Sequence, residues 1–152
     1  MKKILIFNGH PNTGSFCHSL ALAYQKGAGE GAAEIQQISL DSLEFNPNLK
    51  FGYSKISELE PALIEAQNKI KWADHIVFVY PNWWGGMPAV MKGFFDRTFL
   101  PGFAFKYRKD SPLPEKLLSG KQIQIYKLFE GGKELVVAEI TKSLKAKYHR
   151  LQ

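Results

Sequence analysis

The sequence has a single cysteine, Cys17, and no long apolar run. One cysteine rules out an intrachain disulfide and favours a reducing compartment, so we expect a cytoplasmic protein. The apolar residues 4–7 near the start are followed at once by the polar residues 8–10. This segment is too short for a signal peptide or a membrane span, and no membrane insertion is expected.

Two glycine-rich phosphate-binding fingerprints are also missing, because neither G-x-G-x-x-G nor the lysine-containing P-loop occurs. Their absence argues against a Rossmann dinucleotide site and against ATP hydrolysis. The length of 152 residues fits one domain, residues 1–152, which can bury a sufficient core without disulfides or a metal. We therefore expect no metal site.

Positive charge is concentrated in the last third of the chain. Residues 1–100 carry nine Lys/Arg and nine Asp/Glu, whereas residues 101–152 carry eleven against five, which accounts for the net charge of +6. The basic residues are scattered along a segment with helical periodicity and form no nucleic-acid recognition motif. A solvated helix face is the better interpretation, and no nucleic-acid partner is expected.

The most informative stretch is the loop at residues 81–88, which contains Trp83 and Trp84. A β-branched and aromatic run at 76–80 precedes it and predicts a buried strand. Helical spacing of apolar residues over 87–97 predicts a helix directly after it. Such loops lie at the carboxyl edge of a parallel sheet, where ligands bind. The two indoles either cover a flat ligand or cap the core.

A second loop of interest occupies residues 8–15 and is rich in Gly, Ser, Thr and Asn. It follows a predicted strand at 3–7 and precedes a predicted helix at 16–25, with Ser15 as a suitable N-cap. Loop N–H groups and a helix N-terminus converge on anions, so this loop either binds phosphate or is an ordinary connection. Residues 27–33 are expected to be a loose link.

The remaining segments complete an alternation of strands and helices. Strands are predicted at 34–40 and 120–126, and helices over 57–72, opened by a capping box at residues 57–60, and over 133–148. Residues 41–53 and 98–107 are expected to be irregular, with the latter loop continuing through Pro112 and Pro114. The aromatic residues of 98–107 either line a pocket or pack onto the domain.

This β-α-β-α-β-α-β-α pattern predicts an α/β protein with a parallel sheet in the flavodoxin-like order. The phosphate-suited loop then follows the first strand, and the aromatic loop follows its neighbour, the third. One ligand that reaches both loops needs a phosphate end and a flat aromatic end. Flavin nucleotides have both.

Two motifs carry a resemblance to a known family. Gly9-His10-Pro11 with Ser15-Phe16, and P-N-W-W-G-G-M-P-A at 81–89 with K-G-F-F-D-R at 92–97, resemble the flavodoxin-like NAD(P)H:quinone oxidoreductases. The resemblance covers residues 1–125. It implies a three-layer flavodoxin-like sandwich, of which four strands are evident here and the usual fifth is missing. It also implies a homodimer and a flavin, FAD or FMN.

The resemblance assigns roles by position. Residues matching His10, Ser15, Phe16 and Cys17 surround the flavin phosphates in the family. The isoalloxazine is held by residues matching Pro81, Asn82, Trp83, Trp84 and Gly85. The segment matching Phe103, Phe105 and Tyr107 borders the substrate pocket at a dimer interface.

The chemistry implied by the resemblance belongs to the flavin. Hydride arrives from NAD(P)H at N5 and leaves to a quinone or nitro-compound, so no catalytic side chain is assigned. Cys17 and His18 are expected on the helix surface rather than as a catalytic pair.

Residues 126–152 depart from the family, whose members continue with a Thr/Gly-rich loop, a fifth strand and a final helix. We expect this end to weaken flavin affinity or to promote self-association. Two alternatives to a reductase stay open: a flavin-binding regulatory subunit of a transporter, and a truncated, inactive remnant. The choices of FAD or FMN, NADH or NADPH, and the acceptor also stay open.

Overall fold

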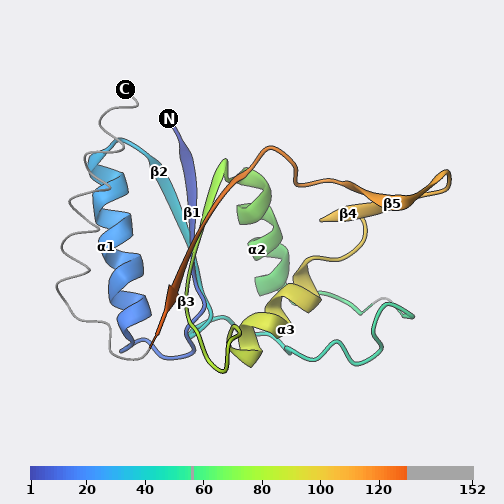
Figure 1. The fold of residues 1–152 in the computed structure, drawn as a ribbon, viewed down its shortest axis with the longest axis horizontal. Coiled ribbons are helices and arrows are strands. Elements are labelled where there is room, and N and C mark those ends of the chain that lie inside the picture. Colours follow the sequence, from blue (N-terminus) through green and yellow to red (C-terminus); the bar gives the residue numbers. More distant parts are fainter. Residues whose placement is uncertain (56, 130–152) are drawn as a thin grey trace.

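A four-stranded parallel sheet forms the centre of the molecule. The computed structural model describes residues 1–55 and 57–129. The sheet contains β1 (Lys3–Asn8), β2 (Glu34–Ser39), β3 (His75–Pro81) and β6 (Gln122–Leu128), in the order β2-β1-β3-β6 (Figure 1). This order confirms the α/β class and makes β1 and β3 neighbours. The loops that leave β1 and β3 therefore start side by side at one edge of the sheet.

Helices cover both faces of the sheet, as expected for parallel strands. Figure 1 shows α1 (Phe16–Glu30) on one face and α2 (Pro61–Trp72) with α3 (Ala89–Thr98) on the other. Helix α1 runs five residues beyond Gln25, so the expected loose link at 27–33 was wrong. Gly27 and Ala28 are buried on the sheet side of α1, and this packing outweighs the low helix propensity of glycine.

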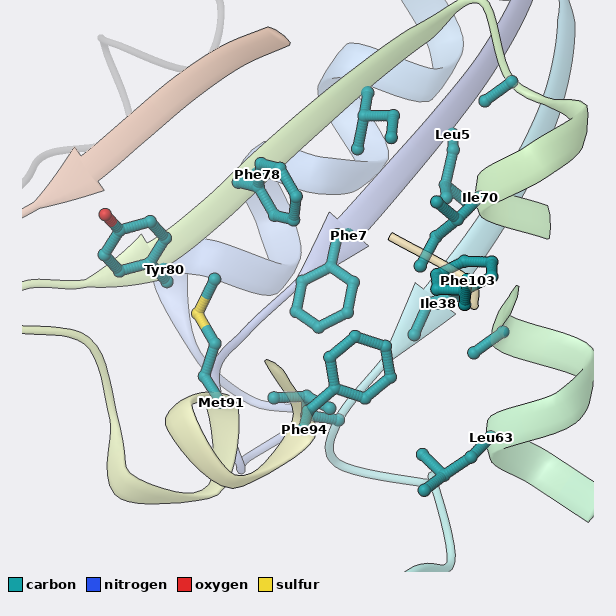
Figure 2. Close-up of a cluster of buried hydrophobic side chains, with 14 residues drawn as sticks. Leu5, Phe7, Ile38, Leu63, Ile70, Phe78, Tyr80, Met91, Phe94 and Phe103 are labelled. Carbon is teal, nitrogen blue, oxygen red and sulfur yellow. The ribbon is translucent and has the colours of Figure 1, made fainter. Parts of the chain in front are cut away.

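Side chains of the two central strands alternate between two cores. Leu5 and Phe7 of β1 pack with Phe78 and Phe94 on the α2–α3 side (Figure 2), where the Phe7 and Phe94 rings lie 4.8 Å apart. Ile4 and its neighbours on alternate positions face α1 instead. All seven residues of β3 are buried. This burial on both faces fixes the positions of the two loops that follow β1 and β3.

The segment expected to be an irregular aromatic loop forms a β-hairpin instead. Strand β4 (Phe105–Arg108) pairs antiparallel with β5 (Ser111–Lys116). The two prolines, Pro112 and Pro114, fit β5 because only one edge of a strand in a two-stranded ribbon needs N–H donors. In Figure 1 the hairpin projects beyond α2, away from the loops that follow β1 and β3.

The predicted capping box at residues 57–60 was also wrong. Glu60 occupies the N-cap position of α2 but makes no side-chain cap, although Pro61 starts the helix as expected. The Glu60 carboxylate instead accepts hydrogen bonds from Arg97 Nη2 at 2.7 Å and from Asn46 N–H at 3.1 Å. Arg97 is only 4% exposed. A buried guanidinium requires a counter-charge, and this need decides the use of Glu60.

These contacts make part of the stability dependent on pH. Burial works to raise the pKa of Glu60, but hydrogen bonds from Asn46 and Arg97 outweigh it and hold that pKa below the ordinary value of 4.5. The folded state therefore binds fewer protons than the unfolded chain below about pH 4.5, and stability falls as the solution is acidified through this range. We expect Glu60→Gln to flatten the dependence of the unfolding free energy on pH between pH 5 and 3, measured by urea denaturation. An unchanged slope would contradict this assignment.

Strand β6 lies at the edge of the sheet, and no further strand joins it within residues 1–55 and 57–129. Ile123 and Ile125 of β6 are 62% and 53% exposed. Self-association through this edge stays a prediction. The predicted helix over 133–148 lies outside the described residues. Within the described part of the chain, no helix has the length and apolar character required to cross a membrane.

Candidate functional site

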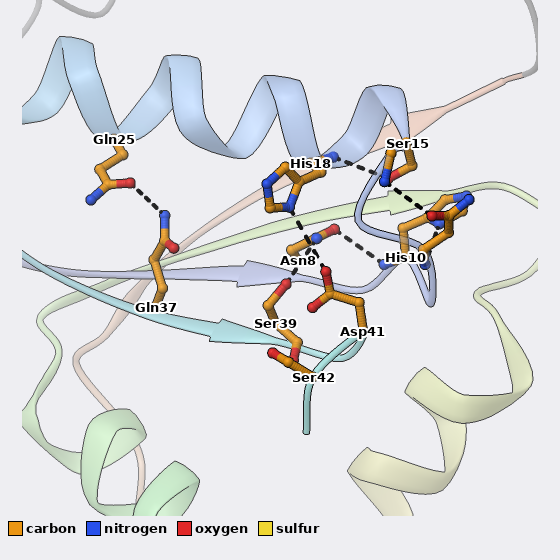
Figure 3. A network of polar contacts seen from close by, with 11 residues as sticks. Asn8, His10, Ser15, His18, Gln25, Gln37, Ser39, Asp41 and Ser42 are labelled. Atoms are coloured by element: carbon orange, nitrogen blue, oxygen red, sulfur yellow. Dashed lines mark hydrogen bonds and ion pairs between the residues drawn. The ribbon is translucent and has the colours of Figure 1, made fainter. Parts of the chain in front are cut away.

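The carboxyl edge of the sheet brings the two motif-bearing loops together. Gly9 N–H donates to Val79 O at 2.8 Å, which ties the loop after β1 to strand β3. Asn8, the last residue of β1, is buried, and its Nδ2 donates to Ser39 Oγ at 3.0 Å (Figure 3). The ends of β1, β2 and β3 thus form one connected polar edge.

The loop after β1 is shaped by a chain of short-range hydrogen bonds. His10 N–H donates to Asn8 Oδ1 at 3.2 Å, Asn12 N–H to His10 Nδ1 at 3.0 Å, and Gly14 N–H to Asn12 Oδ1 at 3.0 Å. Each bond fixes a turn two residues long. The loop is therefore preorganised rather than dependent on a ligand for its shape.

Helix α1 begins at this loop with Ser15 as its N-cap, as predicted. Ser15 Oγ accepts from His18 N–H at 3.2 Å. Phe16 and Cys17 occupy the first turn, where N–H groups have no acceptor within the helix. These amides and the helix dipole make the start of α1 suitable for an anion such as a phosphate.

Gly9 sits where the loop passes closest to α3. A Cβ at this position would lie 2.5 Å from Met91 Sδ and 2.9 Å from Tyr80 Cβ. We expect Gly9→Ala to lower the free energy of unfolding by about 1–3 kcal/mol, because overpacking at this contact forces side chains or backbone to shift. Gly14→Ala is the matched control, since the nearest atom to its Cβ would be 3.6 Å away. Equal stability of the two variants in urea denaturation would contradict this account.

Cys17 and His18 differ in exposure, so the expectation that both lie on the helix surface was wrong for Cys17. Cys17 is buried in the core on the α1 side of the sheet, and burial raises the pKa of its thiol to about 11. The Cys17 side chain is therefore not available to a ligand at the loop after β1, whereas its backbone N–H is. The His18 side chain is 34% exposed, and its Nδ1 lies 3.9 Å from Asp41 Oδ2.

The loop after β3 is a tight turn that presents two indoles. Trp83 N–H donates to Gly86 O at 3.0 Å, and Gly86 N–H returns a bond of 2.9 Å to Trp83 O. The two central residues, Trp84 and Gly85, have φ of +50° and +77°, as a two-residue turn of the primed type requires. A tryptophan at positive φ is uncommon, and such strain is concentrated at functional sites.

Both tryptophan side chains are available to a ligand. Trp83 is 39% exposed and Trp84 is fully exposed, so the alternative that they cap the core is wrong. Pro81 is buried as the last residue of β3, and Asn82 N–H donates to Leu128 O at 2.8 Å, which anchors the turn to β6. The backbone of the turn is thus anchored to β6, while the Trp84 indole lies in solvent and Trp83 is partly exposed.

His10 connects the two loops. Its ring lies 5.4 Å from the Trp83 ring in an edge-on arrangement. Burial lowers the pKa of His10 below its ordinary value of 6.5. Its Nδ1 accepts the Asn12 N–H, which requires that nitrogen to be unprotonated. His10 is therefore neutral near pH 7 in the free protein.

The three residues assigned to a substrate pocket are not brought to these loops within one chain. Phe103 is buried in the α2–α3 core, Phe105 is half-buried, and Tyr107 is exposed on the hairpin. The Phe105 and Tyr107 rings contact each other edge-on at 5.3 Å. A role for Phe105 and Tyr107 at a substrate site stays a prediction.

Sequence reasoning missed Asp41, which follows β2 at the same edge. Its side chain is only 4% exposed, and its Oδ1 has no hydrogen-bond partner among the described residues. The sequence feature that could have identified Asp41 is its place directly after a predicted strand, because such a residue lies at the carboxyl edge of the sheet.

Comparison with known proteins supports this topology. A family described as having the flavodoxin-like fold matches residues 2–142. The chain is 28% identical over 127 residues to NAD(P)H dehydrogenase (quinone) 1 of Rattus norvegicus, an alignment that covers 70% of this chain and 46% of the rat protein. It is 32% identical over 130 residues to an uncharacterized NAD(P)H oxidoreductase of Haemophilus influenzae, covering 82% and 62% of the two chains.

A solved structure with lower sequence identity has a similar fold. The NAD(P)H:quinone oxidoreductase of Methanothermobacter marburgensis superposes with a TM-score of 0.73 at 20% identity, over 99% of each chain. The alignments span less than two thirds of the length of the two curated relatives. The family match covers most of the chain, and the strand order agrees with it. The chain therefore belongs to the family with the flavodoxin-like fold.

Proposed function

We propose that the chain binds a flavin, FAD or FMN, across the loops after β1 and β3, and that it transfers hydride from NAD(P)H to a quinone or nitro-compound. The observation that carries the proposal is the contact between the two loops. A preorganised anion site and a pair of exposed indoles are joined by the His10–Trp83 ring contact at 5.4 Å. A ligand with a phosphate at one end and a flat ring at the other matches this arrangement.

The residues present fit a flavin. The first-turn amides of Phe16 and Cys17 are placed for the phosphate, and the Ser15 hydroxyl adds a polar group at the same point. Trp83 and Trp84 offer flat apolar surface for the isoalloxazine, and stacking between aromatic rings is favourable. When bound, the flavin would supply hydride acceptance and donation at N5. The side chains orient it and exclude water from the ring.

The donor and acceptor are proposed from the relatives. The rat relative is named an NAD(P)H dehydrogenase (quinone), and the Haemophilus relative an NAD(P)H oxidoreductase. We propose the same donor and a quinone-like aromatic acceptor for this chain, acting in the cytoplasm. A homodimer would allow Phe105 and Tyr107, which lie on the exposed hairpin, to border the site of a second copy.

Flavin binding can be tested directly by fluorescence. Titration of FAD and of FMN with the purified chain should quench flavin emission in a saturable manner, because a ring stacked on indole loses its fluorescence. The competing remnant hypothesis predicts no quenching by folded protein. Circular dichroism of the same sample distinguishes a folded chain without a site from an unfolded one.

A further inference from the structure

The row of β1 side chains that faces α1 ends in a buried asparagine. Ile4 and Ile6 of this row are buried in the core on the α1 side, and Asn8 follows them at the next alternate position. Asn8 is only 3% exposed. An apolar side chain would suit such a position, because a buried amide is costly unless its polar atoms form hydrogen bonds. We therefore expect the Asn8 amide to have a role beyond packing.

The Asn8 amide joins the end of β2 to the loop after β1. Its Nδ2 donates to Ser39 Oγ at 3.0 Å, and its Oδ1 accepts the His10 N–H at 3.2 Å (Figure 3). The backbone O of Asn8 also accepts the Leu40 N–H at 3.0 Å. Because an amide oxygen only accepts and an amide nitrogen only donates, the two side-chain contacts fix the orientation of the Asn8 amide. The start of the loop is thus attached to β2 through Asn8.

His10 extends this attachment to the second loop of the proposed site. Its backbone N–H is held by Asn8, and its ring is held by the Asn12 N–H, which donates to Nδ1 at 3.0 Å. The same ring lies edge-on to the Trp83 ring at 5.4 Å. A shift of the His10 backbone would therefore move both the loop that precedes α1 and the ring that contacts the indole. Asn8 is the buried end of this series of contacts.

We infer that Asn8 is a positioning residue that keeps the phosphate end and the ring end of the proposed site at a fixed separation. This inference rests on the proposed function, because it concerns a flavin that contacts both loops at once. A ligand whose two ends bind to parts held in place gains affinity from the two contacts together. This gain falls when one part becomes free to move relative to the other. Loss of the Asn8 amide should therefore weaken the joint binding more than it weakens binding of the ring alone.

The test compares FMN with riboflavin, which has the same ring system but no phosphate. Fluorescence titration of the full chain gives both dissociation constants, and their ratio measures how much the phosphate adds to binding. We expect Asn8→Ala to lower this ratio by about threefold to tenfold, the effect of one hydrogen bond on an equilibrium constant, and to change riboflavin affinity by less than about twofold. A purely structural role would change both affinities by the same factor. If FAD binds and FMN does not, FAD replaces FMN in the ratio.

Two variants of Ser39 test the same bridge from the side of β2. Ser39→Ala removes the acceptor of the Asn8 Nδ2 donor, whereas Ser39→Thr keeps a hydroxyl at that position. We expect Ser39→Ala to lower FMN affinity and Ser39→Thr to retain the affinity of the wild type. This pair requires no riboflavin, and it replaces Asn8→Ala if circular dichroism shows that Asn8→Ala does not fold.

A matched control lies on the connection before α2. Asn46 Oδ1 accepts the Asn48 N–H at 2.9 Å, in the same two-residue pattern as Asn8 and His10, so Asn46→Ala should leave the ratio unchanged. An unchanged ratio in folded Asn8→Ala, or equal FMN affinities of Ser39→Ala and Ser39→Thr, would overturn the inference alone. Equal binding of FMN and riboflavin by the wild type would also overturn it, although the proposed ring site would stand. Failure of the folded wild type to bind any flavin would overturn the proposed function as well.

Discussion

Replacement of Arg97 by methionine is expected to lower the free energy of unfolding by about 3–5 kcal/mol, because it leaves a carboxylate and two carbonyls without their buried donor. The guanidinium donates to Asn46 O at 2.6 Å, Glu58 O at 3.0 Å and Glu60 Oε2 at 2.7 Å. These bonds tie the long connection before α2 to α3. Urea denaturation followed by circular dichroism gives the measurement.

A matched control is available on the same helix. Lys92 of α3 pairs with Asp96 at 2.5 Å, but the Lys92 side chain is 61% exposed. Exposed ion pairs contribute little, so Lys92→Met should change the unfolding free energy by less than about 1 kcal/mol. Similar losses in the two variants would show that burial of Arg97 is not what makes its contacts strong.

Removal of both loop indoles, in the variant Trp83→Ala with Trp84→Ala, is expected to weaken flavin binding by about 100-fold or more. Each stacked ring is worth about 1–3 kcal/mol, and about 1.4 kcal/mol corresponds to a factor of ten. Trp84 is fully exposed and Trp83 is 39% exposed with one ring contact to His10, so their loss should lower the unfolding free energy by no more than about 1 kcal/mol. Fluorescence titration and urea denaturation of the same preparation measure the two quantities.

Trp72 provides the opposite control. It is the last residue of α2 and packs partly buried against the α2–α3 core. Trp72→Ala should therefore lower stability, as large-to-small core changes do, and leave flavin affinity close to that of the wild type. An unchanged flavin affinity in the Trp83/Trp84 variant would place the ring elsewhere.

The sequence was sufficient to predict the sheet because strong local signals agree with burial. The runs at 4–7 and 76–80 are continuously apolar, and both became parts of buried central strands. Because the ends of these two runs are distinct, the sequence also predicts where the loops after β1 and β3 begin. The hairpin was missed because the alternation in residues 105–108 is short and two prolines follow it, so pairing between β4 and β5 rather than local propensity decides its structure.

The site was predictable only where its residues are local to a motif. His10, Ser15 and the two tryptophans lie on two short loops, and their positions follow from the strands that precede them. Burial of Cys17, the contact of His10 with Trp83, and the position of Asp41 beside His18 depend on packing between distant segments. The capping box failed for the same reason, because Arg97 competes for Glu60 from 37 residues away.

The proposed function requires that this chain carries a flavin that cycles between donor and acceptor. The most direct measurement is the visible absorption spectrum of the purified chain with bound FAD or FMN, recorded without oxygen. The proposed function predicts that NADPH or NADH bleaches the flavin band and that a soluble quinone restores it. A bound flavin that neither nicotinamide reduces, in a chain shown to be folded, would contradict the oxidoreductase assignment.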